Sequence, residues 1–161
     1  MNEFERLRKR RETISQPRVR DEAIPGYGGY LIARYHIVPW EVVSKIAQRA
    51  EKAGDTDPRT TLNAQIDLLV SACEGLFVKN GDGDKPTLEP LLDGEGQIIK
   101  YDKRLAENMQ FEANSAREVV LGLFVQELAI ANHHNKILEW MQGEAEDVDE
   151  EFLGESSRPL P

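Results

Sequence analysis

The sequence predicts an α+β protein that is mainly helical, with about four helices and a small two- or three-stranded antiparallel sheet. Residues 57–79 repeat apolar side chains at helical spacing, which indicates a central buried helix. Residues 30–38 and 97–101 are short runs rich in β-branched and aromatic side chains, which favour strands. Of the 161 residues 40% are hydrophobic and 30% are charged, typical of one folded domain with polar extensions.

Both ends of the chain are expected to be flexible tails. Residues 6–20 contain seven basic and one acidic side chain, so residues 1–22 are predicted to form a flexible basic arm. Residues 144–161 contain seven acidic side chains and one basic one, which predicts a disordered acidic tail. Between them, residues 23–143 are predicted to form a single globular domain, which begins at the Pro/Gly-rich break 23–29.

The domain begins with the strand 30–38 and an amphipathic helix over 39–53. Pro39 suits the first helical position and Gly54 suits the end of the helix. The connection to the next helix is short, so the two helices are expected to lie side by side and nearly antiparallel.

The helix predicted over 57–79 should contribute most of the core. Asp57 is a good N-cap and Pro58 fits the first turn. Its apolar residues are Leu62, Ile66, Leu69, Cys73 and Leu76. Each large apolar side chain that is fully buried contributes about 1.5–3 kcal/mol, so this helix should be covered on most of its circumference.

A turn over 79–84 and a polar loop over 85–96 come next. The short strand 97–101 is predicted to form a hairpin with 76–79, and the strand 30–38 is a candidate third member of the sheet.

Two further helical segments complete the domain. Asp102 is predicted to cap a short helix over 103–110. Ser115 and Glu118 form a capping box that opens the last major element. The apolar face of that element continues with or without a break near 124–126.

Calcium binding is not expected, although one loop begins like an EF-hand. Asn80, Asp82 and Asp84 have the alternate spacing of calcium ligands, but the sixth and twelfth positions hold Lys85 and Leu91. A calcium loop requires glycine and a bidentate glutamate there.

The remaining chemistry-bearing residues do not predict an enzyme, a cofactor or a metal site. His133 and His134 are adjacent, so on a helix they point about 100° apart and cannot chelate one metal as an i, i+4 pair would. Cys73 is the single cysteine and is predicted to be a small buried hydrophobe. Phosphate-binding loops, dinucleotide fingerprints and nucleophile elbows are absent from the sequence, so no catalytic residue is predicted.

Charge and hydropathy limit the partners. The net charge of −9 argues against nucleic-acid binding by the whole molecule. No apolar run approaches 18 residues, so neither a membrane span nor membrane binding is expected and the protein is predicted to be soluble and intracellular.

The order of the apolar blocks resembles a known family. The blocks, in order, are LIARYHIVPWEVV, DLLVSACEGLFVKN, IIKYDKRLAE, SAREVVLGLF, ILEW and DVDEEFLGE. This order is similar to that of the tail assembly chaperones of long-tailed phages, and more narrowly to the short, non-frameshifted product of that gene in phages of actinobacteria. The resemblance covers about residues 24–155, and it carries no counterpart of the basic head.

The resemblance implies a non-enzymatic assembly factor that binds the tape measure protein and keeps it soluble during tail morphogenesis. Such chaperones act in the host cytoplasm and are not retained in the mature virion. Their genes commonly make a longer product by programmed ribosomal frameshifting, which is thought to recruit the tail tube protein. Family members are largely helical and tend to self-associate.

The predicted partner-binding residues are Ile130, Ile137, Trp140, Phe152 and Leu153. The first three are equally compatible with the core, whereas the last two are the only large apolar pair in the acidic tail. An alternative hypothesis is a small adaptor or regulatory protein whose basic arm binds nucleic acid, and salt dependence of binding would distinguish the two functions.

Overall fold

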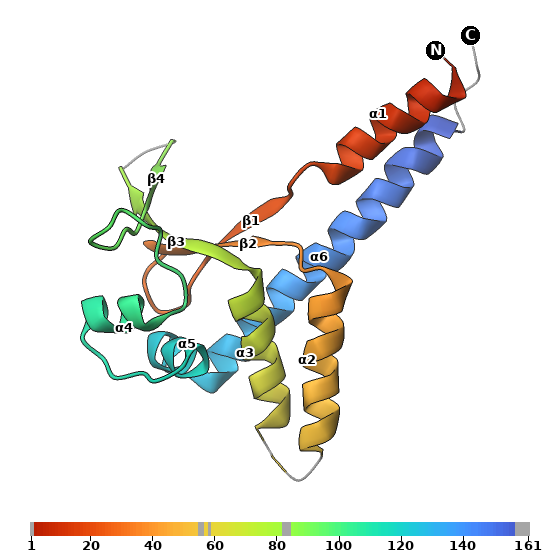
Figure 1. Cartoon of the computed structure of the whole chain (residues 1–161). Coiled ribbons are helices and arrows are strands. Elements are labelled where there is room, and N and C mark those ends of the chain that lie inside the picture. The colour runs from red at the N-terminus through yellow and green to blue at the C-terminus, as the bar shows by residue number, and fades with distance from the viewer. Residues whose placement is uncertain (1, 55–56, 58, 82–84, 157–161) are drawn as a thin grey trace.

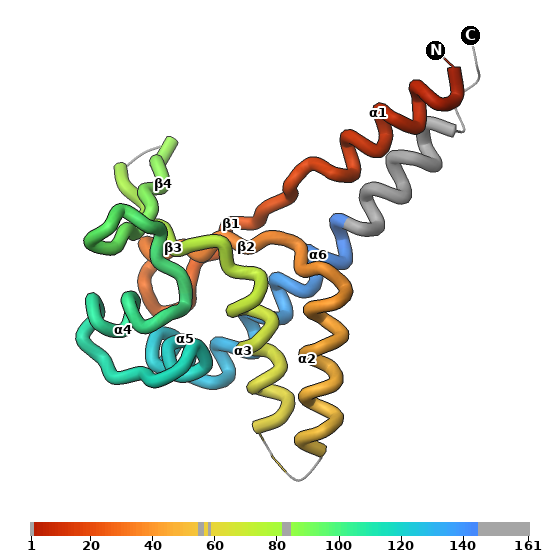
Figure 2. The backbone as a smooth tube through the Cα atoms, viewed as in Figure 1, coloured from red at the N-terminus to blue at the C-terminus, as the bar shows by residue number. Residues whose placement is uncertain are grey.

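The computed structural model describes residues 2–54, 57, 59–81 and 85–156, with the side chains of the last helix described as far as Glu144 (Figures 1 and 2). The elements in chain order are α1 (Glu3–Ser15), β1 (Val19–Ala23), β2 (Leu31–His36), α2 (Trp40–Ala53), α3 (Thr60–Ala72), β3 (Cys73–Asn80), β4 (Thr87–Pro90), α4 (Lys103–Met109), α5 (Ala116–Phe124) and α6 (Glu127–Ser156). The architecture is α+β and mainly helical.

The four strands form one antiparallel sheet in the order β1-β2-β3-β4. β1 and β2 form a hairpin, and the side chains of Asp21 and Arg34 join the two strands with hydrogen bonds of 2.7 and 3.1 Å. The chain then leaves the sheet through the helical hairpin α2–α3 and returns as β3 beside β2 (Figure 1). β4 turns back along the free side of β3.

The prediction of about four helices and a two- or three-stranded sheet is wrong in both counts, since six helices and four strands occur within the described residues. β1 lies in the segment predicted to be a flexible arm, and β4 lies in the predicted polar loop. The predicted strand 97–101 is not one: Ile98 forms only an isolated bridge with Leu92, and Ile99 bonds to the backbone of Leu76 and Leu91.

The central helix is shorter than predicted, because α3 ends at Ala72 and the chain continues directly as β3. Gly75 weakens a helix by about 1 kcal/mol, while Phe77 and Val78 favour a strand. A Cβ atom at position 75 would lie 2.2 Å from Ile98 Cδ1, so glycine leaves the room that the Ile98 side chain needs against β3. The apolar run is buried as predicted, but part of it belongs to the sheet.

Several predicted helix boundaries are confirmed. α2 begins after Pro39 and ends at Gly54, whose φ of +67° favours glycine. The Asp102 side chain caps α4 by accepting from the Arg104 N–H at 3.0 Å. At α5, Ser115 accepts from the Glu118 N–H, whereas the Glu118 carboxylate bonds the Asn114 N–H instead of completing the predicted capping box.

Residues 18–27 run antiparallel to α6 and contact it at successive points. Arg18 forms an ion pair with Glu144, and Lys136 Nζ lies 3.7 Å from Glu22 Oε1. The Tyr27 hydroxyl donates to the carbonyl of Leu123 at the end of α5. The predicted domain boundary between residues 22 and 23 therefore falls inside β1, and α1 projects from the body (Figure 2).

The core lies around α3, which packs against α2, α5 and α6. Its largest fully buried side chains are Tyr35, Ile24, Ile66, Leu69, Leu76, Leu105, Leu123, Ile130, Ile137, His133, Val119 and Val120. Within the described part of the chain, no helix combines the length and the apolar character that a membrane span requires.

Candidate functional site

The predicted partner-binding residues differ in how far they are buried. Ile130 and Ile137 are completely buried, so their side chains belong to the core and present no surface to a partner. Trp140 is half-buried and packs against the core, and its Nε1–H donates to Glu144 Oε1 at 3.2 Å. Phe152 and Leu153 belong to α6, but the structure does not describe their side chains.

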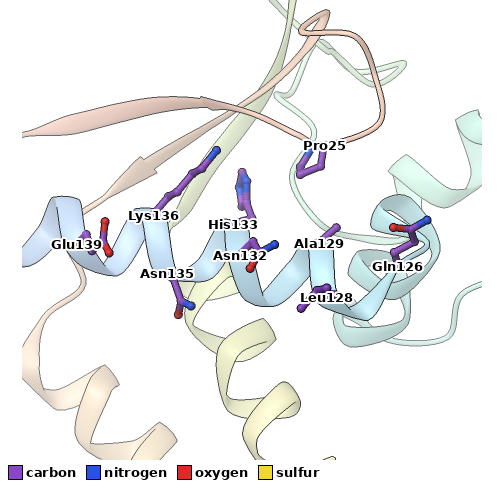
Figure 3. A pocket seen from close by; sticks show the side chains of 9 residues that line it. All are labelled: Pro25, Gln126, Leu128, Ala129, Asn132, His133, Asn135, Lys136 and Glu139. Atoms are coloured by element: carbon purple, nitrogen blue, oxygen red, sulfur yellow. The ribbon is translucent and has the colours of Figure 1, made fainter.

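A surface groove lies between α6 and the loop that joins β1 to β2. Its larger part has a volume of about 540 Å³ and is lined by Pro25, Gln126, Leu128, Ala129, Asn132, His133, Asn135, Lys136 and Glu139 (Figure 3). Pro25 faces α6 across the hollow, while His133 and Lys136 point toward the strands. The smaller part, of about 360 Å³, shares Pro25, Gln126 and Ala129 with it and extends to Tyr27 and Val125. Together they are called the junction groove.

The junction groove has two highly exposed apolar side chains, Val125 and Leu128, with exposed fractions of 78% and 73%. They flank the break between α5 and α6. Their position at the edge of a hollow makes this exposed apolar pair a candidate binding surface.

The break itself is a strained turn. Val125 has φ +66° and ψ −47°, and the Gln126 N–H donates to the Phe124 carbonyl at 2.7 Å, which makes a classic γ-turn. A β-branched residue is disfavoured at positive φ, and such strain costs about 1–3 kcal/mol. Strain retained on an exposed valine makes this turn a candidate functional position.

The opposite wall of the groove is held in place by the loop 24–30. The Ile24 N–H bonds the Leu31 carbonyl at 2.9 Å, and the Tyr30 N–H bonds the Tyr27 carbonyl at 3.0 Å. Because Tyr27 also bonds the end of α5, this wall is fixed to the same turn that exposes Val125. The groove is therefore preformed on both sides.

A buried polar network lies beneath the groove. His133 is 2% exposed, its Nε2 is 2.8 Å from the Tyr35 hydroxyl, and that hydroxyl also contacts the hydroxyl of Tyr101. Burial lowers the pKa of His133 to about 4 and raises the pKa of Tyr35 and Tyr101 well above their ordinary value. All three groups are therefore neutral near pH 7, and the network satisfies buried polar atoms.

The other chemistry-bearing residues of the sequence are Cys73, His134 and the EF-hand-like segment. Cys73 is buried as predicted, and burial raises the pKa of its thiol to about 12, so no thiolate forms near neutral pH. His134 is half-buried and contacts Asn135. In the EF-hand-like segment, Asp82 and Asp84 are outside the described residues. Elsewhere in the described ranges, no three metal-binding side chains gather.

In comparisons with known proteins, no protein family, no curated protein and no solved structure matches the chain. The groove therefore has to be interpreted from its own residues. Sequence reasoning identified the possible break at 124–126, and an apolar Val125 beside such a break was the available signal. Pro25 and Tyr27 were seen only as part of a Pro/Gly-rich break.

Proposed function

We propose that the protein is a non-enzymatic tail assembly chaperone that binds a helical segment of a tape measure protein in the junction groove. The observation that carries the proposal is the preformed groove with the exposed side chains of Val125 and Leu128 at its strained turn. An amphipathic client helix can bury its apolar face in such a groove. The proposed chaperone acts in the host cytoplasm and does not remain in the virion.

Charge supports a solubilising role. The chain has a net charge of −9, so a complex whose apolar surfaces are covered would carry excess negative charge and resist aggregation. Beside the two apolar side chains, the groove presents Asn132, Asn135 and Glu139. This polar rim suits reversible binding of an amphipathic helix.

The state of the reactive groups supports a binding role. The thiol of Cys73 is buried and stays protonated near pH 7, and the neutral imidazole of His133 is buried as well, so neither group is accessible to a substrate. Nucleophilic catalysis requires an accessible group activated by a neighbouring base. We identify the client as a tape measure protein because the sequence resembles the phage tail assembly chaperones.

Co-expression with the cognate tape measure protein tests the proposal. The client should become soluble and co-purify, and Leu128→Asp should weaken binding about tenfold to a hundredfold, since one buried leucine contributes about 1.5–3 kcal/mol. Leu92→Asp is the matched control, because Leu92 is also exposed but lies outside the groove. Both variants should retain the thermal stability of the parent.

Salt dependence separates this function from the alternative adaptor function. Arg6, Arg8 and Arg11 are exposed on α1 and could contact phosphates. Binding in the groove should change little between about 0.05 and 0.3 M salt, whereas phosphate contacts weaken steeply over that range. A client that precipitates in the presence of the chaperone, together with salt-sensitive retention of labelled DNA, would refute the chaperone function.

A further inference from the structure

Helix α1 carries an exposed apolar stripe. Phe4, Leu7 and Ile14 are 75%, 54% and 54% exposed. Together with Arg11, which is also exposed, they follow one another at spacings of three, four and three residues, so they share one face of the helix. This is the spacing of the a and d positions of a heptad repeat, along which paired helices meet. We call these residues the α1 stripe.

Contacts at both ends and along one side position α1. At its start, Asn2 Oδ1 accepts from the Glu5 N–H at 2.8 Å and the Glu5 carboxylate accepts from the Asn2 N–H at 3.3 Å, which is a complete capping box. At its end, a short connection that includes Pro17 joins α1 to β1. Arg10 is 8% exposed and interacts within the structure, so another side of the helix is already covered. The α1 stripe is therefore presented before a partner binds, which lowers the entropic cost of binding.

The charges around the α1 stripe favour an acidic partner. Residues 6–11 contain five basic side chains and no acidic one. Arg11 lies within the stripe, and Arg8 follows Leu7 at the e position beside it. In paired helices, residues at e and g form ion pairs with the partner, and a polar residue at one a position selects which partner fits. The surface therefore suits a helix whose apolar side chains are flanked by carboxylates.

A second copy of the chain fits the α1 stripe poorly. In a parallel pair of α1 helices, Arg11 faces Arg11. In an antiparallel pair that matches Phe4 with Ile14, residues 6–11 of one copy run along residues 7–12 of the other. Both arrangements bring basic side chains together, and such like-charge contacts destabilise a pair.

Nucleic acid also fits the α1 stripe less well than a helix does. Phosphate contacts are made by basic and polar groups, so they leave the three large apolar side chains of the stripe exposed to water. A partner helix covers these side chains and pairs with the arginines at the same time.

We propose that the α1 stripe is a docking surface for an acidic amphipathic helix of a partner protein. The partner packs large apolar side chains against Phe4, Leu7 and Ile14 and places a carboxylate opposite Arg11. No residue of α1 lines the junction groove, so this surface is separate from the proposed client site.

Fluorescence anisotropy with two designed peptides tests the proposal on the full-length protein. The acidic probe is about three heptads long and has leucine at a and d, glutamate at e and g, and one glutamate at its central a position. The basic probe has lysine in place of every glutamate. The acidic probe should bind about tenfold more tightly than the basic probe, because Arg8 and Arg11 each gain an ion pair with it and are repelled by the other.

Two variants test the apolar and the charged parts of the stripe separately. Leu7→Asp should weaken binding of the acidic probe about tenfold, since it removes a large apolar contact. Leu92→Asp is the matched control: Leu92 is 53% exposed but lies outside α1, so affinity should not change. The double variant Arg8→Glu, Arg11→Glu should reverse the preference and favour the basic probe. Thermal melts followed by circular dichroism verify that each variant stays folded.

Three results would overturn the proposal. Equal affinity for both probes, or no binding of either, would show that the α1 stripe does not select an acidic helix. Binding of labelled duplex DNA that is lost in Arg8→Glu, Arg11→Glu but kept in Leu7→Asp would identify a phosphate-binding surface instead. A dimer in analytical ultracentrifugation that dissociates in Leu7→Asp would identify a second copy of the chain as the occupant.

Discussion

Replacing Val125 with glycine should stabilise the protein while weakening its binding of a client. The valine has φ +66°, and relief of this strain should contribute about 1–3 kcal/mol. Glycine opposes the gain by about 0.5–1 kcal/mol through its greater backbone freedom when unfolded. Little packing is lost, because the side chain is 78% exposed. The free energy of unfolding should therefore rise by up to about 2.5 kcal/mol.

Thermal unfolding followed by circular dichroism measures this change. A gain of 1 kcal/mol raises the melting temperature by about 2–4 °C in a domain of this size, so Val125→Gly should raise it by up to about 10 °C. Val125→Ala is the comparison variant, since it removes the same methyl groups but keeps the Cβ atom and should stabilise less. If Val125→Gly melts below the parent protein, the argument from backbone strain is wrong.

Three further predictions test the core and its polar network. Leu69→Ala should lower the free energy of unfolding by about 2–5 kcal/mol, whereas Glu74→Ala at a half-exposed position should have little effect; denaturant titration would compare them. Tyr35→Phe should cost about 1–3 kcal/mol, because His133 and Tyr101 lose their shared hydrogen-bond partner in the core, and equal midpoints in the same titration would contradict this. The pKa of His133 is lowered to about 4 by burial, so the unfolded chain binds the proton more tightly. Stability should fall as the pH drops from about 6.5 to about 4, by on the order of 3 kcal/mol, and His133→Gln should lack that component of the pH profile.

Local signals in the sequence were sufficient for several helices. Pro39 and Gly54 bound α2, and the side chains of Asp102 and Ser115 cap α4 and α5 as expected. Each of these signals acts within one turn of helix. The strand β2 was likewise identified from its β-branched and aromatic residues.

The extent of the central helix could not be predicted from its apolar spacing. Leu69 and Leu76 are both completely buried, yet the first lies in α3 and the second in β3. A segment that is buried on all sides carries no periodic polar face, so helix and strand give the same apolar pattern. Gly75, followed by the strand-favouring Phe77 and Val78, was the local signal for the change.

The N-terminal segment, which was expected to be a flexible tail, is structured through contacts with residues that are distant in the sequence. Val19 to Ala23 alternate little in polarity, but they pair with β2, and Glu22 lies near Lys136 of α6. Deleting residues 1–22 would remove most of β1, so this deletion should destabilise the fold. The junction groove was missed for the same reason, because Pro25 and Val125 are a hundred residues apart.

The most direct test of the proposed function is site-specific photo-crosslinking in cells that make the cognate tape measure protein. A benzophenone amino acid would replace Leu128 in the groove or, as the control, the exposed Leu92 outside it. The account predicts a covalent adduct with the tape measure protein from position 128 and none from position 92. Equal crosslinking from both positions, or none from position 128 while the client remains soluble, would contradict binding in the junction groove.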